Sequence, residues 1–334
     1  MNVLVTGGAG YIGSVVAEEL VDSGHHVIIL DNLQQGHIDA VPAEAEFILA
    51  DIGNGTTVDS VLQRFNIAAV MHMAAETVVE HSMTDPRRFF QNNIAKGLVL
   101  LDAMLKNGIR RIIFSSSAAV YGNPETIPIE ENHPKKPLNA YGDTKLMFEK
   151  ILEWYGWAYG LQHVSLRYFN AAGATDLSGE EHNPETHLIP KVLQAALDKS
   201  KTVTVFGTDC ATRDGSCVRD YIHVADIARA HLLALDKLDH LTVRAYNLGN
   251  GNGYSVLEVI DTATRVTGSD IRVTLCDRRA GDPGELVASS ELARAEIGWK
   301  PQFELEAILE SAWKWTLKHP AGYGCEHVLA GRGK

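Results

Sequence analysis

The chain has 334 residues, 45% of them apolar, and can therefore bury the core of one large domain or two smaller ones. Its formal net charge of −12 at pH 7 argues against nucleic acid or an anionic membrane as a partner. The four cysteines have no metal-ligand spacing, no apolar run is long enough to span a membrane, and the first residues read as a strand instead of a signal peptide. These features predict a cytoplasmic protein without a structural metal.

Short apolar runs recur along the chain with helical stretches between most of them, which predicts a doubly wound parallel α/β sheet. The expected strands are residues 2–7, 26–31, 46–51, 68–75, 111–117, 162–170 and 245–250. The pattern loosens from about residue 171, and no Pro/Gly/Ser-rich linker follows. We therefore expect one domain from residues 1–170 and about 226–250, and across a cleft a smaller, interleaved α/β lobe from about 171–225 and 251–334.

A glycine-rich turn follows the first expected strand, with glycines at 7, 10 and 13 and a helix pattern from Ile12 onward. Such a loop lets the backbone approach a pyrophosphate at a helix start, although the spacing departs from the commoner G-x-G-x-x-G. Asp31 ends the next strand, where its carboxylate can bind an adenosine ribose and repel a 2′-phosphate. The loop predicts NAD binding in preference to NADP; a purely structural strand-helix-strand unit is the alternative.

Polar residues follow the strand at 111–117, which ends in three serines, at the edge where parallel sheets bind ligands. Farther along, Tyr141 and Lys145 are four residues apart, so a helix places them on one face. We expect the ammonium to draw the tyrosine pKa down from about 10 and to favour proton transfer at a sugar hydroxyl. Each feature alone also has a bland explanation, a turn cap for the serines and coincidence for the pair, but together they predict a catalytic site.

With three further motifs, the chain resembles the extended short-chain dehydrogenase/reductase family over essentially its whole length, and within it the nucleotide-sugar epimerases. These motifs are Leu-Arg-Tyr-Phe-Asn at 166–170, Val-Arg-Asp-Tyr-Ile-His-Val at 218–224 and Arg-Arg-Ala-Gly-Asp at 278–282. The resemblance implies an NAD-binding Rossmann domain and a UDP-sugar-binding lobe. It implies interconversion of UDP-glucose and UDP-galactose by inversion at the sugar 4-position, through a transient 4-keto intermediate and enzyme-bound NADH.

Other reactions are alternatives to that one. A related UDP-sugar, such as a UDP-N-acetylhexosamine, UDP-pentose or UDP-uronic acid, can be the substrate of a 4-epimerase. A nucleotide-sugar dehydratase needs an Asp-Glu pair just after the serines, where this chain has Ala118 and Ala119. An NAD-dependent dehydrogenase would release its cofactor in each cycle. A non-catalytic NAD sensor usually lacks the tyrosine or the lysine, and both are present here.

The resemblance also implies roles for individual residues. Tyr141 is the acid/base, Lys145 holds the nicotinamide ribose, and Ser117 binds the reacting oxygen and relays its proton. The cofactor-binding residues are Gly7, Gly10, Tyr11, Ile12, Gly13, Asp31, Asn32, Asp51, Ile52, Ala74, Ala75, Thr77, Asn92, Ser115, Tyr141, Lys145 and Tyr168. The substrate-binding residues are Ser117, Tyr141, Asn170, His187, Leu188, Phe206, Arg219, Arg279 and Asp282. An ion pair for either arginine, or a helix cap for Asp282, is the structural alternative.

The chain departs from the family pattern at three positions. Thr77 replaces a cofactor-contacting lysine, and Ala119 replaces a threonine two residues after the catalytic serine. Leu286 takes the position that sizes the sugar pocket and is of intermediate volume, so N-acetyl sugars stay possible. The histidines show no ligand spacing, and we expect surface or loop positions for them.

Two helical stretches, 94–105 and 146–157, carry apolar residues over more than one stripe. One stripe can cover the sheet while the second meets another subunit, and the resemblance implies a homodimer formed in this way. The alternative is that loops or the other lobe cover the second stripe.

Overall fold

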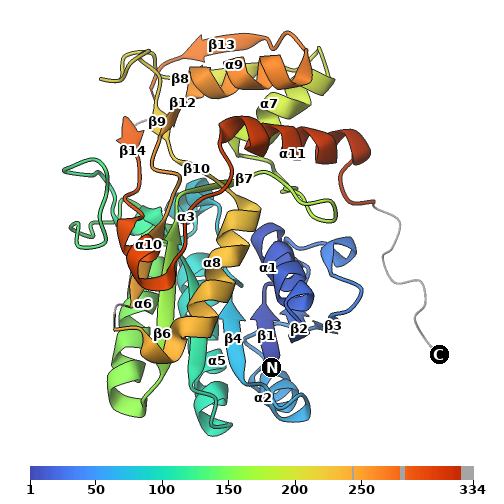
Figure 1. The fold of residues 1–334 in the computed structure, drawn as a ribbon, viewed down its shortest axis with the longest axis vertical. Coiled ribbons are helices and arrows are strands. Elements are labelled where there is room, and N and C mark those ends of the chain that lie inside the picture. Colours follow the sequence, from blue (N-terminus) through green and yellow to red (C-terminus); the bar gives the residue numbers. More distant parts are fainter. Residues whose placement is uncertain (243, 279–282, 325–334) are drawn as a thin grey trace.

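A computed structural model describes residues 1–242, 244–278 and 283–324 of the chain. Its centre is a seven-stranded, all-parallel sheet with the strand order β11-β6-β5-β4-β1-β2-β3 (Figure 1). Every predicted strand is present, most of them shorter than predicted, and the predicted fold class is confirmed. The strands are β1 Asn2–Thr6, β2 His26–Asp31, β3 Glu46–Leu49, β4 Ala69–His72, β5 Arg111–Ser117, β6 Gln162–Tyr168 and β11 Ala245–Leu248.

Helices cover both faces of this sheet, which explains the nearly continuous apolar runs of its strands. Along β1, Val3 and Val5 pack into the core on one face and Leu4 into the core on the other. The first face is covered by α1 Tyr11–Asp22, α8 Val224–Lys237 and α10 Glu291–Ile297. The second is covered by α2 Gly55–Arg64, α5 Lys96–Lys106 and α6 Ala140–Tyr159.

A third core belongs to the smaller lobe, drawn above the sheet in Figure 1. Its helices are α7 Leu188–Leu197, α9 Val256–Thr267 and α11 Leu305–Lys318, and its parallel strand pair is β8 Val203–Phe206 with β13 Val273–Cys276. Ala293, Ile297 and Trp299 pack into the core of the sheet domain instead. The division into two lobes at the predicted boundaries stays a prediction.

Short elements join the sheet to the smaller lobe. Strand β7 Asn170–Ala172 pairs with β10 Tyr221–His223, and β9 Val218–Arg219 lies between β12 Tyr254–Ser255 and β14 Glu285–Leu286. The helical turns are η1 Ile38–Ala40, α3 Val79–Thr84, α4 Pro86–Phe89, the π-helical η2 Phe90–Ala95, η3 Ala118–Val120 and η4 Leu238–His240. Among the helices described, none has the length and apolar character needed to cross a bilayer.

The expectation that the histidines are surface or loop residues is wrong for several of them. His72 and His163 are buried on sheet strands, and His231 is buried on α8. Their side chains fill the space between sheet and helices. His72, for example, stacks on Phe114 with the ring centroids 5.7 Å apart.

Strands β1 and β4 are neighbours, and the chain winds outward in opposite directions from them. This is the topological switch point of the sheet, and ligands of such sheets bind outside the carboxyl ends of the strands there. The glycine loop follows β1 directly, so the fold places it at this point.

Candidate active site

A cleft of about 970 Å³ runs along the carboxyl ends of the sheet strands and reaches the smaller lobe. Apart from Ser115, all the predicted cofactor and substrate residues that the structure describes line this cleft. Arg279 and Asp282 lie outside the described residues. The residues that line it are Gly7, Gly10, Tyr11, Ile12, Gly13, Asp31, Asn32, Asp51, Ile52, Ala74, Ala75, Thr77, Asn92, Ser117, Tyr141, Lys145, Tyr168, Asn170, His187, Leu188, Phe206 and Arg219.

The glycine loop leaves room for a ligand at the start of α1. Gly7 has a φ of +75°, and a Cβ there would lie 2.6 Å from the backbone nitrogen of Ala74. Only glycine therefore lets the loop after β1 pack against the chain after β4. A Cβ on Gly10 would meet no described atom closer than 3.4 Å, so the space in front of the helix start is open. The residues fit a pyrophosphate bound by the backbone N–H groups of α1.

Asp31 holds this loop in place from the end of β2. One carboxylate oxygen accepts a hydrogen bond from the backbone nitrogen of Ala9 (3.0 Å), and the other accepts one from that of Leu33 (2.8 Å). Burial raises the pKa of Asp31, although these hydrogen bonds oppose the rise. A carboxylate facing the cleft at this place fits a ribose with free hydroxyls and disfavours an added phosphate.

Asp51 lies at the far end of the cofactor side of the cleft. Its carboxylate accepts hydrogen bonds from Lys96 Nζ (2.7 Å), Asn32 Nδ2 (3.0 Å) and the backbone nitrogen of Gly53 (2.8 Å). Burial works in the opposite direction, but these contacts hold the pKa of Asp51 below its usual value. Asp51 thus connects the loops after β2 and β3.

Ser117, Tyr141 and Lys145 come together where β5 ends and α6 begins. Asn139 caps α6, accepting a hydrogen bond from the backbone nitrogen of Gly142 (2.9 Å). The Ser117 hydroxyl lies close enough to the Tyr141 phenol to lower its pKa. Lys145 Nζ donates to the carbonyl oxygen of Ser115 (2.7 Å) and lies 5.8 Å from the centre of the Tyr141 ring.

The electrostatics of this pair differ from the prediction. Burial raises the pKa of Tyr141, and only the hydrogen bond with Ser117 opposes it. Burial lowers the pKa of Lys145 to about 7, with the charge of Glu149 acting against this. The prediction of a lowered tyrosine pKa is therefore wrong for this structure, because burial is the largest influence on Tyr141 and acts in the opposite direction.

Ser115 lies beneath the cleft and not in its wall. Its hydroxyl is 3.2 Å from His231 Nε2 and is hydrogen-bonded to Tyr168, while its carbonyl accepts the bond from Lys145. Ser115 thus holds two residues that do line the cleft.

The sequence analysis missed a buried ion pair behind the catalytic residues. Arg167 on β6 donates to both carboxylate oxygens of Glu149 (2.9 and 2.5 Å), and Ser116 donates to the same carboxylate (2.5 Å). Both charged side chains are about 95% buried. The sequence offered one indication of this pair, because Glu149 follows Lys145 by one helical turn. Its partner Arg167 lies on a different element, so the pairing itself was not visible in the sequence. The network fixes α6 against the sheet.

Residues 218–224 position the other side of the cleft. The buried Asp220 carboxylate accepts hydrogen bonds from the backbone nitrogens of Asn250, Gly251 and Ala288 (2.6 to 3.0 Å). His223 caps α8 through the backbone nitrogen of Ala225 (3.1 Å). The motif thus clamps several loops together and holds Arg219 in the cleft wall.

These observations together describe a cleft that fits a dinucleotide on one side, with the predicted acid/base residue Tyr141 in its wall. A sequence profile described as the NAD dependent epimerase/dehydratase family matches residues 3–249. The chain belongs to this family. Its epimerase relatives extend the similarity over the remainder of the chain, including the smaller lobe.

One relative, a UDP-glucose 4-epimerase from Halalkalibacterium halodurans, is 47% identical over 331 residues, which are 98% of this chain and 99% of that protein. A crystal structure of a UDP-glucose 4-epimerase aligns with a TM-score of 0.95 at 45% identity, covering 97% of this chain and all of the other. A UDP-glucose 4-epimerase from Brucella ovis in complex with NAD aligns with a TM-score of 0.91 at 42% identity, covering 94% and 98%.

Proposed function

We propose that this chain is a UDP-glucose 4-epimerase, which interconverts UDP-glucose and UDP-galactose with NAD as its cofactor. The main support for the proposal is that this chain aligns over nearly its whole length with UDP-glucose 4-epimerases at 45 to 47% identity. The cleft supports it, because the acid/base tyrosine lies between a dinucleotide loop and the smaller lobe. Ala118 and Ala119 argue against dehydration, since neither can donate or accept a proton.

Tyr141 is the group that moves the proton of the sugar 4-hydroxyl. NAD, when bound, supplies the acceptor and donor for hydride at the same carbon. As a base Tyr141 removes the hydroxyl proton, and as an acid it returns a proton to the 4-keto oxygen, so no net redox change results. Ser117, which lies beside Tyr141 and lowers its pKa, binds the reacting oxygen and relays the proton. Lys145 would donate to the cofactor ribose when NAD is bound.

Inversion requires the keto sugar to present its opposite face while its nucleotide stays bound. The lining residues of the smaller-lobe side are suited to holding UDP: Asn170, His187, Leu188, Phe206 and Arg219. A guanidinium matches the oxygens of a diphosphate, so Arg219 is the proposed anchor. Arg279 and Asp282 are proposed for the same site on sequence grounds alone.

The sugar preference rests on Leu286. Its side chain packs against the cluster of Val120, Tyr121, Ile129 and Leu146, next to the end of β5. Leu286 does not line the cleft in this structure, so its effect on pocket size rests on the sequence resemblance, and on that ground UDP-N-acetylhexosamines are the second candidate substrates. UDP-pentoses and UDP-uronic acids are further alternatives.

We also propose that the enzyme is a cytoplasmic homodimer formed through α6. Met147, Trp154 and Trp157 are 42, 67 and 82% exposed on the face of this helix opposite the sheet. Exposed tryptophans gathered on one helix are typical of an interface. The second apolar stripe predicted for residues 94–105 is mostly half-buried on α5, and therefore supports this face less strongly.

Incubation with UDP-galactose tests the proposed reaction. Anion-exchange chromatography should show UDP-glucose appearing until the same ratio is reached from either sugar, with no rise in NADH absorbance in solution. The same assay with UDP-N-acetylgalactosamine, UDP-xylose and UDP-glucuronic acid ranks the alternatives. An oxidised sugar formed in step with NADH would indicate a dehydrogenase and contradict the proposal.

A further inference from the structure

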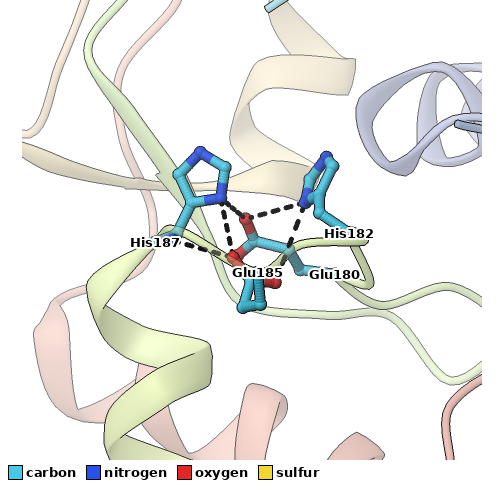
Figure 2. Close-up of side chains that lie close together, drawn as sticks. All are labelled: Glu180, His182, Glu185 and His187. Atoms are coloured by element: carbon cyan, nitrogen blue, oxygen red, sulfur yellow. Dashed lines mark hydrogen bonds and ion pairs between the residues drawn. The ribbon is translucent and has the colours of Figure 1, made fainter. Parts of the chain in front are cut away.

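The turn before α7 brings together four side chains, of which only His187 also has a role in the proposed reaction, as a UDP contact. Figure 2 shows Glu180, His182, Glu185 and His187 pointing toward a common centre. One ligand atom from each lies within 4.8 Å of all the others. They form the sequence pattern Glu-x-His-x-x-Glu-x-His. This pattern mixes glutamate and histidine ligands, and it is not one of the cysteine or histidine spacings typical of metal sites.

The separations between these atoms match a tetrahedral metal site. Ligands bound about 2.1 Å from a tetrahedral zinc ion are roughly 3.4 Å from one another. His187 Nδ1 lies 2.8 and 3.0 Å from oxygens of Glu180 and Glu185, and His182 Nδ1 lies 3.5 and 3.8 Å from oxygens of the same two residues. The distances to Glu185 involve its two different oxygens, and the single ligand atoms of all four residues lie within 4.8 Å of one another.

Charge and burial also favour a cation here. The Glu180 and Glu185 side chains are only 7 and 11% exposed. Within the described ranges, their ion pairs are all with these two histidines and none is with lysine or arginine. His182 Nδ1 is buried without a hydrogen-bond partner of good geometry and faces this group. Buried carboxylates require a compensating positive charge.

We propose that Glu180, His182, Glu185 and His187 bind one divalent transition-metal ion of the zinc class. Imidazole and carboxylate ligands suit Zn²⁺, and four protein ligands make a closed site of the structural type. This inference replaces the sequence-based expectation that the protein holds no metal. It does not depend on the proposed function.

The position of the site indicates that the ion would stabilise the wall of the cleft. His187 directly precedes α7, and the rings of His182 and Tyr11 are in edge contact with their centroids 6.5 Å apart. Tyr11 belongs to the glycine loop and donates to the carbonyl oxygen of Gly173 (2.7 Å). The ion would therefore brace the cleft wall between the dinucleotide loop and α7. We expect it to raise thermal stability and nucleotide affinity.

Metal binding can be measured on the tag-free holoenzyme after treatment with a chelator. Titration with Zn²⁺ against a chromophoric chelator should give one tight site per chain. Co²⁺ in place of Zn²⁺ should give the intense visible absorption of tetrahedral coordination. Failure to bind Zn²⁺ stoichiometrically at micromolar concentrations would overturn the proposal, whatever the enzyme's activity.

Two variants locate the ion. His182→Ala removes one ligand, and Glu185→Gln removes another with little change in volume, so at least one folded variant is expected. Each should weaken Zn²⁺ binding by at least about 100-fold, since loss of even an outer-shell partner costs 10- to 100-fold. His240→Ala, an exposed histidine on η4, is the matched control and should bind like wild type. Unchanged affinity in both ligand variants would place the metal elsewhere and refute this site.

Discussion

At the scale of single residues, the surroundings of Tyr141 show how the fold affects the proposed acid/base group. Its hydroxyl contacts Ser117, its ring makes an edge contact with Phe89 at 6.5 Å, and it is 91% buried. Burial raises the pKa of the phenol, and the contact with Ser117 acts against this rise. Ser117 is therefore the neighbour that makes the phenolate of Tyr141 easier to form.

Tyr141→Phe removes the acid/base group and keeps the ring packing. We expect turnover of UDP-galactose to fall by about two to four orders of magnitude, the usual contribution of general acid/base catalysis. UDP affinity, measured by calorimetry, should change little. Tyr155→Phe is the matched control, because Tyr155 lies on the same helix and donates to Asp102 outside the cleft (3.2 Å). Near-normal turnover of Tyr141→Phe would remove this residue from the mechanism.

At the scale of elements, α6 connects chemistry to stability. It carries Tyr141 and Lys145 in its first turns and Glu149 in its next turn, and the Glu149–Arg167 pair fastens it to β6. The helix is therefore held by a buried charge pair at the place where its position matters for the reaction.

Glu149→Gln leaves the Arg167 charge buried without a carboxylate. We expect the free energy of unfolding to drop by about 3–5 kcal/mol, as measured by urea denaturation. The double variant Glu149→Leu/Arg167→Met replaces the pair by apolar groups and should regain most of that loss. If the double variant is as unstable as the single one, packing and not the unpaired charge accounts for the effect.

Local patterns predicted the elements and most of the cleft. The glycine loop, the serines after β5 and the Tyr141/Lys145 spacing are each encoded within a few consecutive residues, and parallel topology brings them to one edge. The Glu149–Arg167 pair was not predictable in this way, because its partners come from two elements whose packing has no local signal. The predicted lowering of the Tyr141 pKa was also wrong, because the burial that raises it is a property of the whole fold.

At the scale of the whole molecule, buried histidines make stability depend on pH. Burial lowers the pKa of His72 to about 3, and those of His163, His223 and His231 to about 4. Between about pH 4 and 6.5 the unfolded chain binds protons that the folded chain does not, so stability rises with pH in this window. Each such group contributes up to about 1.4 kcal/mol per pH unit.

His163→Leu tests this pH dependence away from the cleft. His163 Nδ1 is buried without a hydrogen-bond partner, so a leucine removes both the titrating group and an unsatisfied atom. Urea unfolding at pH 7.5 and 5.0 should show that the free energy of unfolding falls less on acidification in the variant than in wild type. The difference should equal the contribution of one titrating histidine. His240→Leu, which removes an exposed imidazole, serves as control. An unchanged slope in His163→Leu would mean that other groups govern acid unfolding.

The exposed face of α6 is the last feature at this scale. Trp154 and Trp157 pack edge to face with their ring centroids 5.8 Å apart, and both rings are mostly open to solvent in the single chain. The buried residues Tyr141, Lys145 and Phe148 occupy the opposite face of the same helix. One helix can thus serve the active site on one side and a second subunit on the other.

Trp154→Glu/Trp157→Glu should convert the proposed dimer to a monomer, because like charges would face each other across the two-fold axis of the interface. Light scattering after gel filtration should give the mass of two chains for wild type and the mass of one chain for the variant. Leu317→Glu on α11, 53% exposed, adds a charge at an unrelated apolar site and should leave the mass unchanged. A wild-type protein that is monomeric at micromolar concentrations would contradict the proposed dimer. Because the substitutions lie opposite Tyr141, a folded monomer that retains turnover would further show that each cleft is complete within one chain.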